Sequence, residues 1–168
     1  MSGDITVEPL RSDTVDELRG IRREDISEDF VDGADTILSL NRYGVEHNLV
    51  GRTYLIRLDG RCVGMLLIGD ALEWDTDPAE MRGVPFYRLM GFVIDREYRG
   101  RGIGGRALET AIDACYAEFG VRPIALGCHR DNVDAARFYE RHGFRRVDAY
   151  DGDDQYYLRY PKDSKPRP

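Results

Sequence analysis

The sequence predicts an α/β or α+β fold built on a mixed sheet, and three observations support this prediction. Two apolar runs in the first half are joined by Asp59-Gly60, which is a strong hairpin signal. Residues 86–94 form a near-continuous apolar run, which is typical of a strand buried on both faces in the middle of a sheet. After this run, helix-spaced and strand-like segments alternate to the end of the chain, as expected when helices flank a sheet.

The first 80 residues hold the less regular elements. Residues 5–10 alternate between apolar and polar side chains, like an opening strand. Asp13 precedes a short amphipathic segment at residues 15–21 and is a candidate cap for that helix. A second helical stretch is expected over residues 30–40, and the hairpin strands are expected over residues 53–58 and 62–68.

The second half is more regular. Apolar side chains recur at helical spacing over residues 103–119, and Gly120 is a stop signal for that helix. A strand, a helix and two further strands are then expected, over residues 123–128, 132–142, 144–147 and 155–160. Residues 162–168 are polar and contain proline, so we expect a disordered C-terminal tail behind a single domain at residues 1–161.

Composition and charge argue against several classes of protein. The net charge of −7 argues against a general nucleic-acid binder, whose contact surface is basic. No apolar run approaches the ~20 residues that span a bilayer, and the N-terminus does not resemble a signal peptide, so we expect a cytoplasmic protein with no membrane partner. The three cysteines lie in apolar segments, as reduced core residues do, and the three histidines lack metal-ligand spacing, so no metal site is expected.

The charges are unevenly distributed along the chain. Residues 24–35 hold six acids and no base, and residues 69–80 hold five acids and no base. Between Arg88 and Glu109 there are five arginines and three acids. Two interpretations remain open: the acidic stretches are solvated loops that keep the protein soluble, or they face one site and attract cations.

The densest signal is the glycine- and arginine-rich stretch at residues 95–105, between the buried strand and the long helix. Glycines let a backbone turn tightly and approach a ligand closely. The N-terminus of the following helix offers free N–H groups to an anion, and the charges of Arg99, Arg101 and Arg106 suit phosphates. A plain strand-to-helix corner is the alternative interpretation.

Two familiar phosphate-binding motifs fit this stretch poorly. Gly100-x-Gly102-x-x-Gly105 formally matches the dinucleotide fingerprint, which expects its first glycine at the strand end and an acid on the next strand. Here polar and charged residues precede Gly100, and the next strand ends Gly127-Cys128-His129 without an acid. There is no Gly-Lys-Ser/Thr ending of the kind found in nucleoside-triphosphate loops.

Two motifs together resemble those of the GCN5-related N-acetyltransferase (GNAT) family. Arg99-x-x-Gly102-x-Gly104 resembles the family's pyrophosphate loop. Asn132-x-x-Ala135-x-x-Phe138-Tyr139-x-x-x-Gly143-Phe144 resembles its other signature, in the right order and at a similar distance. The resemblance covers about residues 86–147. It implies a mostly antiparallel sheet with splayed central strands, flanked by helices, and acetyl-CoA as the cosubstrate of an amine N-acetyltransferase.

The resemblance also implies roles for individual residues. Loop amides would wrap the pyrophosphate, and the pantetheine arm would pair with the central strand. The residues so assigned to acetyl-CoA are Phe92, Val93, Ile94, Arg99, Gly100, Arg101, Gly102, Ile103, Gly104, Gly105, Arg106 and Asn132. Asn132 is equally suited to cap a helix. Tyr139 corresponds to the general acid that protonates the departing CoA thiolate, and aromatic packing in the last helix is its structural alternative.

The general base is not identified by the resemblance. An amine with a pKa of ~10 must lose a proton before it attacks a thioester. Some polyamine acetyltransferases of the family carry an acid on the central strand, whereas residues 87–94 contain none. Glu73, Asp75 or another loop acid acting through water, or a neutral amine drawn from solution, are the alternatives.

The acceptor is predicted from charge. If the two acidic stretches face one cleft together with Asp148, Asp151, Asp153 and Asp154, the cleft attracts a small cationic amine such as a polyamine or diamine. An aminoglycoside or a protein N-terminus is also cationic. Tyr156 and Tyr157 are further candidates for lining this cleft. A non-catalytic CoA-binding regulatory module is the rival from another class, and a homodimer remains open.

Overall fold

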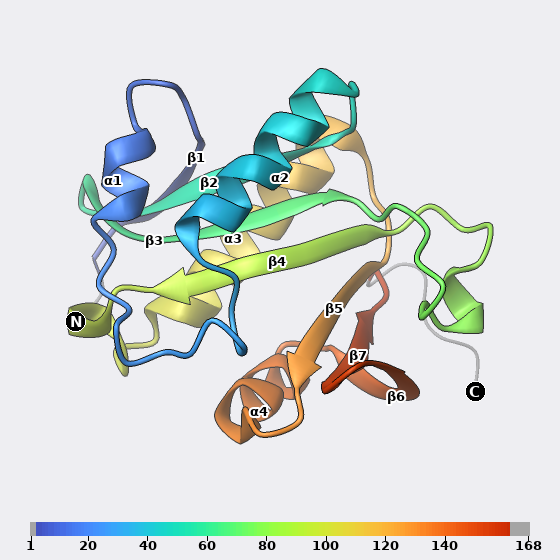
Figure 1. Ribbon diagram of the computed structural model, residues 1–168. Helices are drawn as coiled ribbons and strands as arrows, with labels where there is room; N and C mark the ends of the chain where they lie inside the picture. The colour runs from blue at the N-terminus through green and yellow to red at the C-terminus, as the bar shows by residue number, and fades with distance from the viewer. Residues whose placement is uncertain (1–2, 162–168) are drawn as a thin grey trace.

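Figure 1 shows the computed structural model, which describes residues 3–161; the predicted tail at residues 162–168 lies outside this range. Seven strands form one sheet in the order β1-β2-β3-β4-β5-β7-β6. All neighbours are antiparallel except β4 and β5, which confirms the predicted mixed sheet. The strands are β1 Ile5–Pro9, β2 Gly51–Leu58, β3 Arg61–Asp70, β4 Tyr87–Ile94, β5 Ile124–His129, β6 Arg145–Asp151 and β7 Asp154–Arg159.

Helices cover both faces of the sheet (Figure 1). The helices are α1 Val15–Arg19, α2 Ala34–Glu46, α3 Ile103–Phe119 and α4 Val133–Arg141, with 3₁₀ turns η1 Ala79–Met81 and η2 Arg96–Tyr98. One apolar cluster packs Leu108 and Ile112 of α3 against one face. A second cluster packs Leu18 and Ile37 of α1 and α2 against the other. The sheet is therefore buried on both sides at its centre, as the apolar run at residues 86–94 predicts.

The predicted hairpin is confirmed in detail. Asp59 and Gly60 both have positive φ angles, of 50° and 84°. A two-residue loop with this backbone matches the twist of the strands that it joins, and aspartate and glycine are residues that tolerate it.

The first two helices differ from the sequence prediction. The residue at the N-cap of α1 is Thr14 and not Asp13. The Thr14 hydroxyl donates to the Arg11 carbonyl and does not cap an N–H group of the helix. The second helix begins at Ala34 and not at residue 30, because the chain first makes a separate turn in which the Ser27 carbonyl accepts from the Phe30 N–H, and Gly33 at the N-cap is extended. It continues beyond residue 40 to Glu46, along a partly exposed surface that hydrophobic periodicity does not detect.

β4 contains an extra residue that distorts its pairing with β3. Met65 lies opposite Val93, whereas Leu67 lies opposite Met90. Gly91 sits in this bulge with a φ of 63°, and a Cβ added to it would come within 2.4 Å of Ile37 Cδ1. A glycine is therefore required here for both its backbone conformation and the close approach of α2.

β4 and β5 separate soon after they meet. Their pairing is confined to Tyr87 with Ile124 and Arg88 with Ala125. Beyond this point the two strands diverge, as Figure 1 shows. The splayed pair of central strands expected from the resemblance is present, and the bulge at Gly91 lies where the separation has begun.

Candidate active site

The gap between β4 and β5 is the first feature of the site. From Leu89 to Ile94, the β4 backbone has no register partner on β5 within the described part of the chain. Backbone N–H and C=O groups need partners, so an extended ligand with amide groups can pair with this edge. Phe92, Val93 and Ile94, assigned above to the pantetheine arm, lie along it.

The glycine loop lies directly beyond the end of β4. Asp95 accepts a hydrogen bond from the backbone N–H of Glu97 at 2.9 Å and so begins the η2 turn. Gly100 and Gly102 have φ angles of 76° and 73°, a region that favours glycine. Gly102 is the N-cap of the 17-residue α3, whose first amides belong to Ile103, Gly104 and Gly105. The N-terminus of a long helix, preceded by open glycines, is suited to a phosphate group.

Gly105 has a second, structural requirement. A Cβ at this position would lie 2.8 Å from the His142 ring, so the absence of a side chain lets α3 and the end of α4 pack closely. At Gly104 a Cβ would lie 3.6 Å from the Phe138 ring, which is ordinary contact. The glycines of the predicted loop therefore serve different needs: Gly100 and Gly102 allow a left-handed backbone, and Gly105 allows two helices to pack closely.

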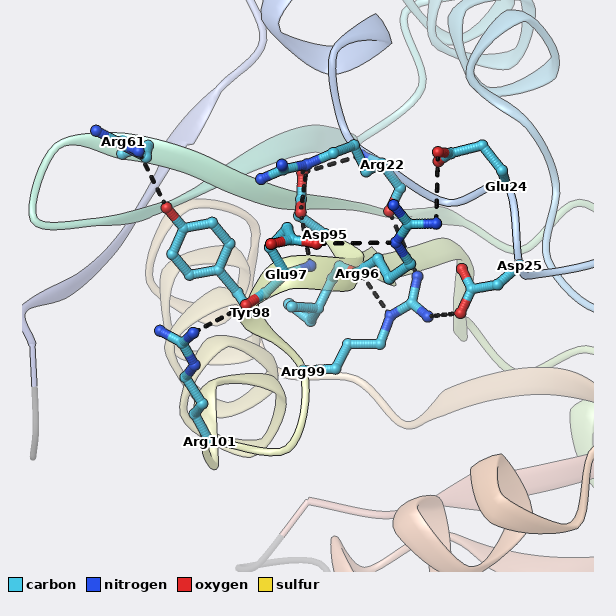
Figure 2. Close-up of polar contacts among 11 residues, drawn as sticks. Arg22, Glu24, Asp25, Arg61, Asp95, Arg96, Glu97, Tyr98, Arg99 and Arg101 are labelled. Carbon is cyan, nitrogen blue, oxygen red and sulfur yellow. Dashed lines mark hydrogen bonds and ion pairs between the residues drawn. The ribbon is translucent and has the colours of Figure 1, made fainter.

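The three arginines predicted at the phosphates have protein partners, and Figure 2 shows those of Arg99 and Arg101. Arg99 donates to the Ile94 carbonyl at 2.8 Å and to the Asp25 carboxylate at 2.5 Å. Arg101 donates to the Glu97 carbonyl at 3.0 Å. Arg106 donates to the Gly3 carbonyl at 2.5 Å. They contribute positive potential around the loop, while the backbone amides at the start of α3 remain as directional donors that suit an anion.

A buried carboxylate ties the loop to the segment after α1. Asp95 is 4% exposed and accepts from the Arg22 backbone N–H at 2.9 Å and from the Arg22 guanidinium at 3.1 Å (Figure 2). Burial by itself raises the pKa of Asp95, but the N–H groups of Arg22 and Glu97 and the Arg22 charge outweigh it, so the pKa lies below its usual value. The ionised carboxylate of Asp95 is therefore the form that accepts these hydrogen bonds and holds the loop.

We expect Asp95→Ala to lower the free energy of unfolding by about 2–3 kcal/mol, because two backbone N–H groups and a guanidinium lose their acceptor. Urea denaturation measures this loss, with Glu97→Ala at a half-exposed neighbouring side chain as the control. The depressed pKa gives stability above the unfolded carboxyl pKa of about 3.9, so the difference between wild type and Asp95→Ala should shrink below that pH. A difference that stays constant into strong acid would contradict this role.

Tyr139 projects from α4 toward the gap between the strands. Its ring packs edge-on against Phe138 and Phe144, with centroids 5.4 and 5.5 Å apart. The side chain lines a cleft together with Phe92 of β4. Burial raises the pKa of Tyr139, with a smaller contribution from the nearby Cys128, so its hydroxyl is protonated at neutral pH. A proton donor must be in this state.

Asn132 lies at the N-cap of α4. Within residues 3–161, its side chain makes no capping hydrogen bond. The position therefore agrees with a cap while the amide is available for other contacts.

The cleft at Tyr139 has a volume of about 260 Å³ and a strongly acidic lining. The carboxylates that line it are Glu28, Asp29, Asp32, Asp151 and Asp154. Among the ion pairs of the described residues, none involves these five side chains. Burial raises the pKa of Asp32 and Asp154, and it outweighs the opposing influence of Arg23 on Asp32 and of His129 on Asp154; nearby carboxylates raise both pKa values further. Five carboxylates outside any ion pair of the described residues, against the single lining arginine Arg88, give this cleft a negative potential.

The second acidic stretch contributes much less than its sequence suggests. Three of its acids are paired with arginines outside the stretch: Asp70 with Arg122, Glu73 with Arg82, and Glu80 with Arg145. The fourth, Asp77, is buried and pairs with Arg88 at 3.1 Å. Glu73 and Asp75, considered above as bases, do not line the cleft. We predicted that acids of both stretches face one cleft. Only the acids within residues 28–32 of the first stretch do so, and no acid of residues 69–80 lines the cleft.

Tyr156 and Tyr157 lie on opposite faces of β7. Tyr156 lines the cleft and donates to Asp77 at 2.7 Å, whereas Tyr157 is buried in the core beneath α3. Asp153 pairs with Arg130, and Asp148 lies away from the cleft lining.

Sequence reasoning missed two further wall elements. The Cζ atom of Arg88 lies over the Trp74 ring, 3.7 Å from the ring centroid, and both residues line the cleft. Gly127 of β5 leaves room for Asp154, because a Cβ there would lie 3.3 Å from that side chain. An isolated glycine within an apolar strand was the available signal for Gly91 and Gly127. For Trp74 the pairing with Arg88 is tertiary and has no local signature.

A cluster of potential ligands and a membrane span were also sought. Across residues 3–161, no group of three or more His, Cys, Asp and Glu side chains is arranged to hold a metal ion. No helix of the described residues is long and apolar enough to cross a bilayer.

Comparisons with known proteins agree with this geometry. The model of the acetyltransferase (GNAT) family matches residues 15–144. Two curated relatives are 31% identical over 87 residues: a probable spermine N(1)-acetyltransferase of Bacillus subtilis subsp. natto (strain BEST195) and a spermine/spermidine N(1)-acetyltransferase of Bacillus subtilis (strain 168). The matched part is 52% of this chain and 55% of each relative, so the chain spans about half the length of these relatives.

Solved structures share the fold. The PaiA N-acetyltransferase from Thermoplasma acidophilum, in complex with coenzyme A, superposes with a TM-score of 0.66 at 18% identity, over 94% of this chain and 99% of that one. The aminoglycoside acetyltransferase AAC(6')-Ib, also with coenzyme A, gives a TM-score of 0.70 at 19% identity, over 94% and 95%.

Proposed function

The chain belongs to the acetyltransferase (GNAT) family, and from that premise we propose that it transfers an acetyl group from acetyl-CoA to an amine. One observation carries the proposal. The unpaired edge of β4 leads directly into a glycine loop at the N-terminus of α3, so an edge that can pair with amides continues into a site for phosphates. Acetyl-CoA has both chemical groups in that order.

The residues proposed to hold acetyl-CoA are those of the β4 end and the loop. Phe92, Val93 and Ile94 supply backbone groups to the pantetheine arm. The amides from Arg101 to Arg106 surround the pyrophosphate, with Gly100 and Gly102 providing the backbone turn. Asn132 contacts the arm, and Arg99 positions the loop through Asp25 and the Ile94 carbonyl.

Tyr139 is proposed as the general acid. When an amine forms its bond to the acetyl carbon, the carbon–sulfur bond breaks and the sulfur requires a proton. Tyr139 holds that proton in a partly buried position beside the gap through which the thioester would enter. Its ring is fixed by Phe138 and Phe144, so the hydroxyl needs little reorganisation.

The acceptor is proposed to be a small cationic amine, with polyamines as the first candidates. The carboxylates from Glu28 to Asp154 that line the cleft lack arginine partners among the described residues and concentrate cations. The names of the two curated relatives point to the same class. The neighbouring aminoglycoside enzyme makes aminoglycosides the second candidate class.

We expect kcat/KM for spermidine to exceed that for a neutral arylamine and to fall several-fold as salt is raised, because screening weakens the attraction of the cleft. A thiol-release assay with acetyl-CoA measures this over a panel containing spermidine, a lysine peptide, an aminoglycoside and an arylamine. Asp32→Asn combined with Asp154→Asn should lower the spermidine value by at least about tenfold, in line with the loss of two nearby charges.

Asp75→Asn is the matched control, since it removes one exposed acid outside the cleft. A preference for the arylamine, or cationic acceptors that are insensitive to salt, would contradict the cationic acceptor. No thiol release with any amine would favour the non-catalytic module.

A further inference from the structure

A second and larger cavity adjoins the reaction cleft. It has a volume of about 930 Å³ and lies between the C-terminal half of α2 and the ends of β2, β3 and β4. Trp74, Arg88 and Met90 line both spaces, so the two share a wall. The two spaces are therefore direct neighbours, and we call the larger one the α2 groove.

The lining of the α2 groove differs from that of the cleft. Its apolar side chains include Leu40, Val45, Leu67, Leu72 and Phe119. Exposed large hydrophobic side chains are few in the described residues, and four of the eight line this groove: Tyr43, Val45, Leu72 and Trp74. Clustered exposed apolar surface marks a binding surface more often than scattered residues do.

The charged side chains around the α2 groove are already paired. Arg52 pairs with Glu118 at 2.6 Å, and Asp70 pairs with Arg122 at 2.6 Å. Arg88 pairs with the buried Asp77. A polycation thus finds carboxylates in the cleft but not in the groove. An apolar group finds apolar side chains to pack against in the groove.

The wall between the two spaces is held in place by Arg88. Its guanidinium donates to the Leu72 carbonyl at 2.8 Å and to Asp77, while Trp74 stacks on it. Tyr156 donates to the same Asp77 carboxylate from β7. The segment around Trp74 is therefore fixed to both halves of the sheet and gives the acceptor path a defined edge.

We propose that the α2 groove is a second acceptor subsite, which binds the alkyl or aryl body of an amphipathic amine while its ammonium group reaches the acidic cleft past Trp74. This inference rests on the proposed function and narrows its substrate class. The shared wall of the two spaces, their opposite chemistry and their unequal volumes support it. Each buried methylene strengthens binding by up to about fourfold, so chain length is a sensitive probe.

The test compares N-ethylputrescine with N-octylputrescine, which differ only in apolar length. In the wild type, kcat/KM should be at least about tenfold higher for the octyl compound, through a lower KM. Gly44 of α2 lines the groove, and a Cβ added there meets nothing within 4 Å. Gly44→Leu should therefore place a bulky side chain in the groove and obstruct it, abolish the gain from the longer chain, and leave kcat/KM for spermidine unchanged. Gly44→Ala is the control that keeps the groove open.

Binding is followed separately from turnover. Trp74 is the single tryptophan of the chain, so its fluorescence reports directly from the shared wall. Octyl-dependent quenching that Gly44→Leu removes supports the subsite even if no amine is acetylated, in which case the proposed function alone fails. Equal affinities for the two compounds, or a chain-length effect that survives Gly44→Leu, overturn the inference. A dimer in ultracentrifugation that Gly44→Leu dissociates also overturns it, because the groove would then belong to a second copy.

Discussion

Tyr139→Phe is expected to reduce kcat by about 10²- to 10⁴-fold while acetyl-CoA affinity stays near the wild-type value. The substitution removes a hydroxyl and retains the ring, whose contacts with Phe138 and Phe144 fix its position. The departing sulfur then lacks its proton donor in a partly buried place where water substitutes poorly. Steady-state kinetics with the best acceptor of the panel measures kcat, and calorimetry measures the cosubstrate affinity.

The control for Tyr139 is Tyr150→Phe, which removes a hydroxyl from an exposed ring on β6. That variant should retain wild-type kcat. A Tyr139→Phe enzyme with near-normal kcat would remove this residue from the mechanism and return it to aromatic packing. A fall in affinity equal to the fall in activity would assign it to binding.

Gly102→Val is expected to weaken acetyl-CoA binding by at least one order of magnitude, or about 1.4 kcal/mol. Gly102 has a left-handed backbone, and a Cβ added to it would meet no atom within 4 Å, on the side where the phosphates are proposed to lie. A β-branched side chain both occupies that space and disfavours the backbone conformation that presents the α3 amides. Calorimetric titration with acetyl-CoA gives the dissociation constant.

Backbone strain at Gly102 also lowers stability, and Gly83→Val separates the two effects. Gly83 has a φ of 71° and equally open surroundings, but it lies between η1 and β4, outside the loop. Both variants should lose similar stability, and only Gly102→Val should lose affinity. Unchanged affinity in a folded Gly102→Val protein would show that the pyrophosphate binds elsewhere.

The sequence predicted the elements that have strong local signals. The hairpin at Asp59-Gly60, the buried strand before the loop and the long helix after it all follow from short-range patterns, and the structure confirms them. The splay of the central strands came from resemblance alone. Its local cause, the bulge at Gly91, was visible as a glycine within an apolar run but was not recognised.

The distribution of charge could not be predicted from the sequence. Residues 69–80 contain no base, yet Arg122 and Arg145 reach Asp70 and Glu80 from distant elements. The carboxylates of Glu28, Asp29 and Asp32 form no ion pair among the described residues and line the cleft, because Arg23 bonds to the backbone carbonyls of this segment instead. Local acidity is therefore a poor guide to potential, because the fold decides which carboxylates meet arginines. The same reason hid the pairing of Arg88 with Asp77 and Trp74.

The two residue pairs between β4 and β5 have a consequence for cooperativity. The sheet consists of two antiparallel parts, one formed by β1–β4 and the other by β5–β7. These two residue pairs are the direct strand pairing between the two parts. Because so few backbone hydrogen bonds join these two parts, their contact depends mainly on side chains, above all on the apolar cluster beneath α3, which contains residues of both parts. At the end where β4 and β5 are paired, Arg88 bonds to Asp77, which in turn accepts from Tyr156 of β7, and these contacts strengthen the connection. Acetyl-CoA is proposed to bind where the two parts of the sheet share few backbone hydrogen bonds. Its binding there would add contacts between the two parts and increase the cooperativity of unfolding.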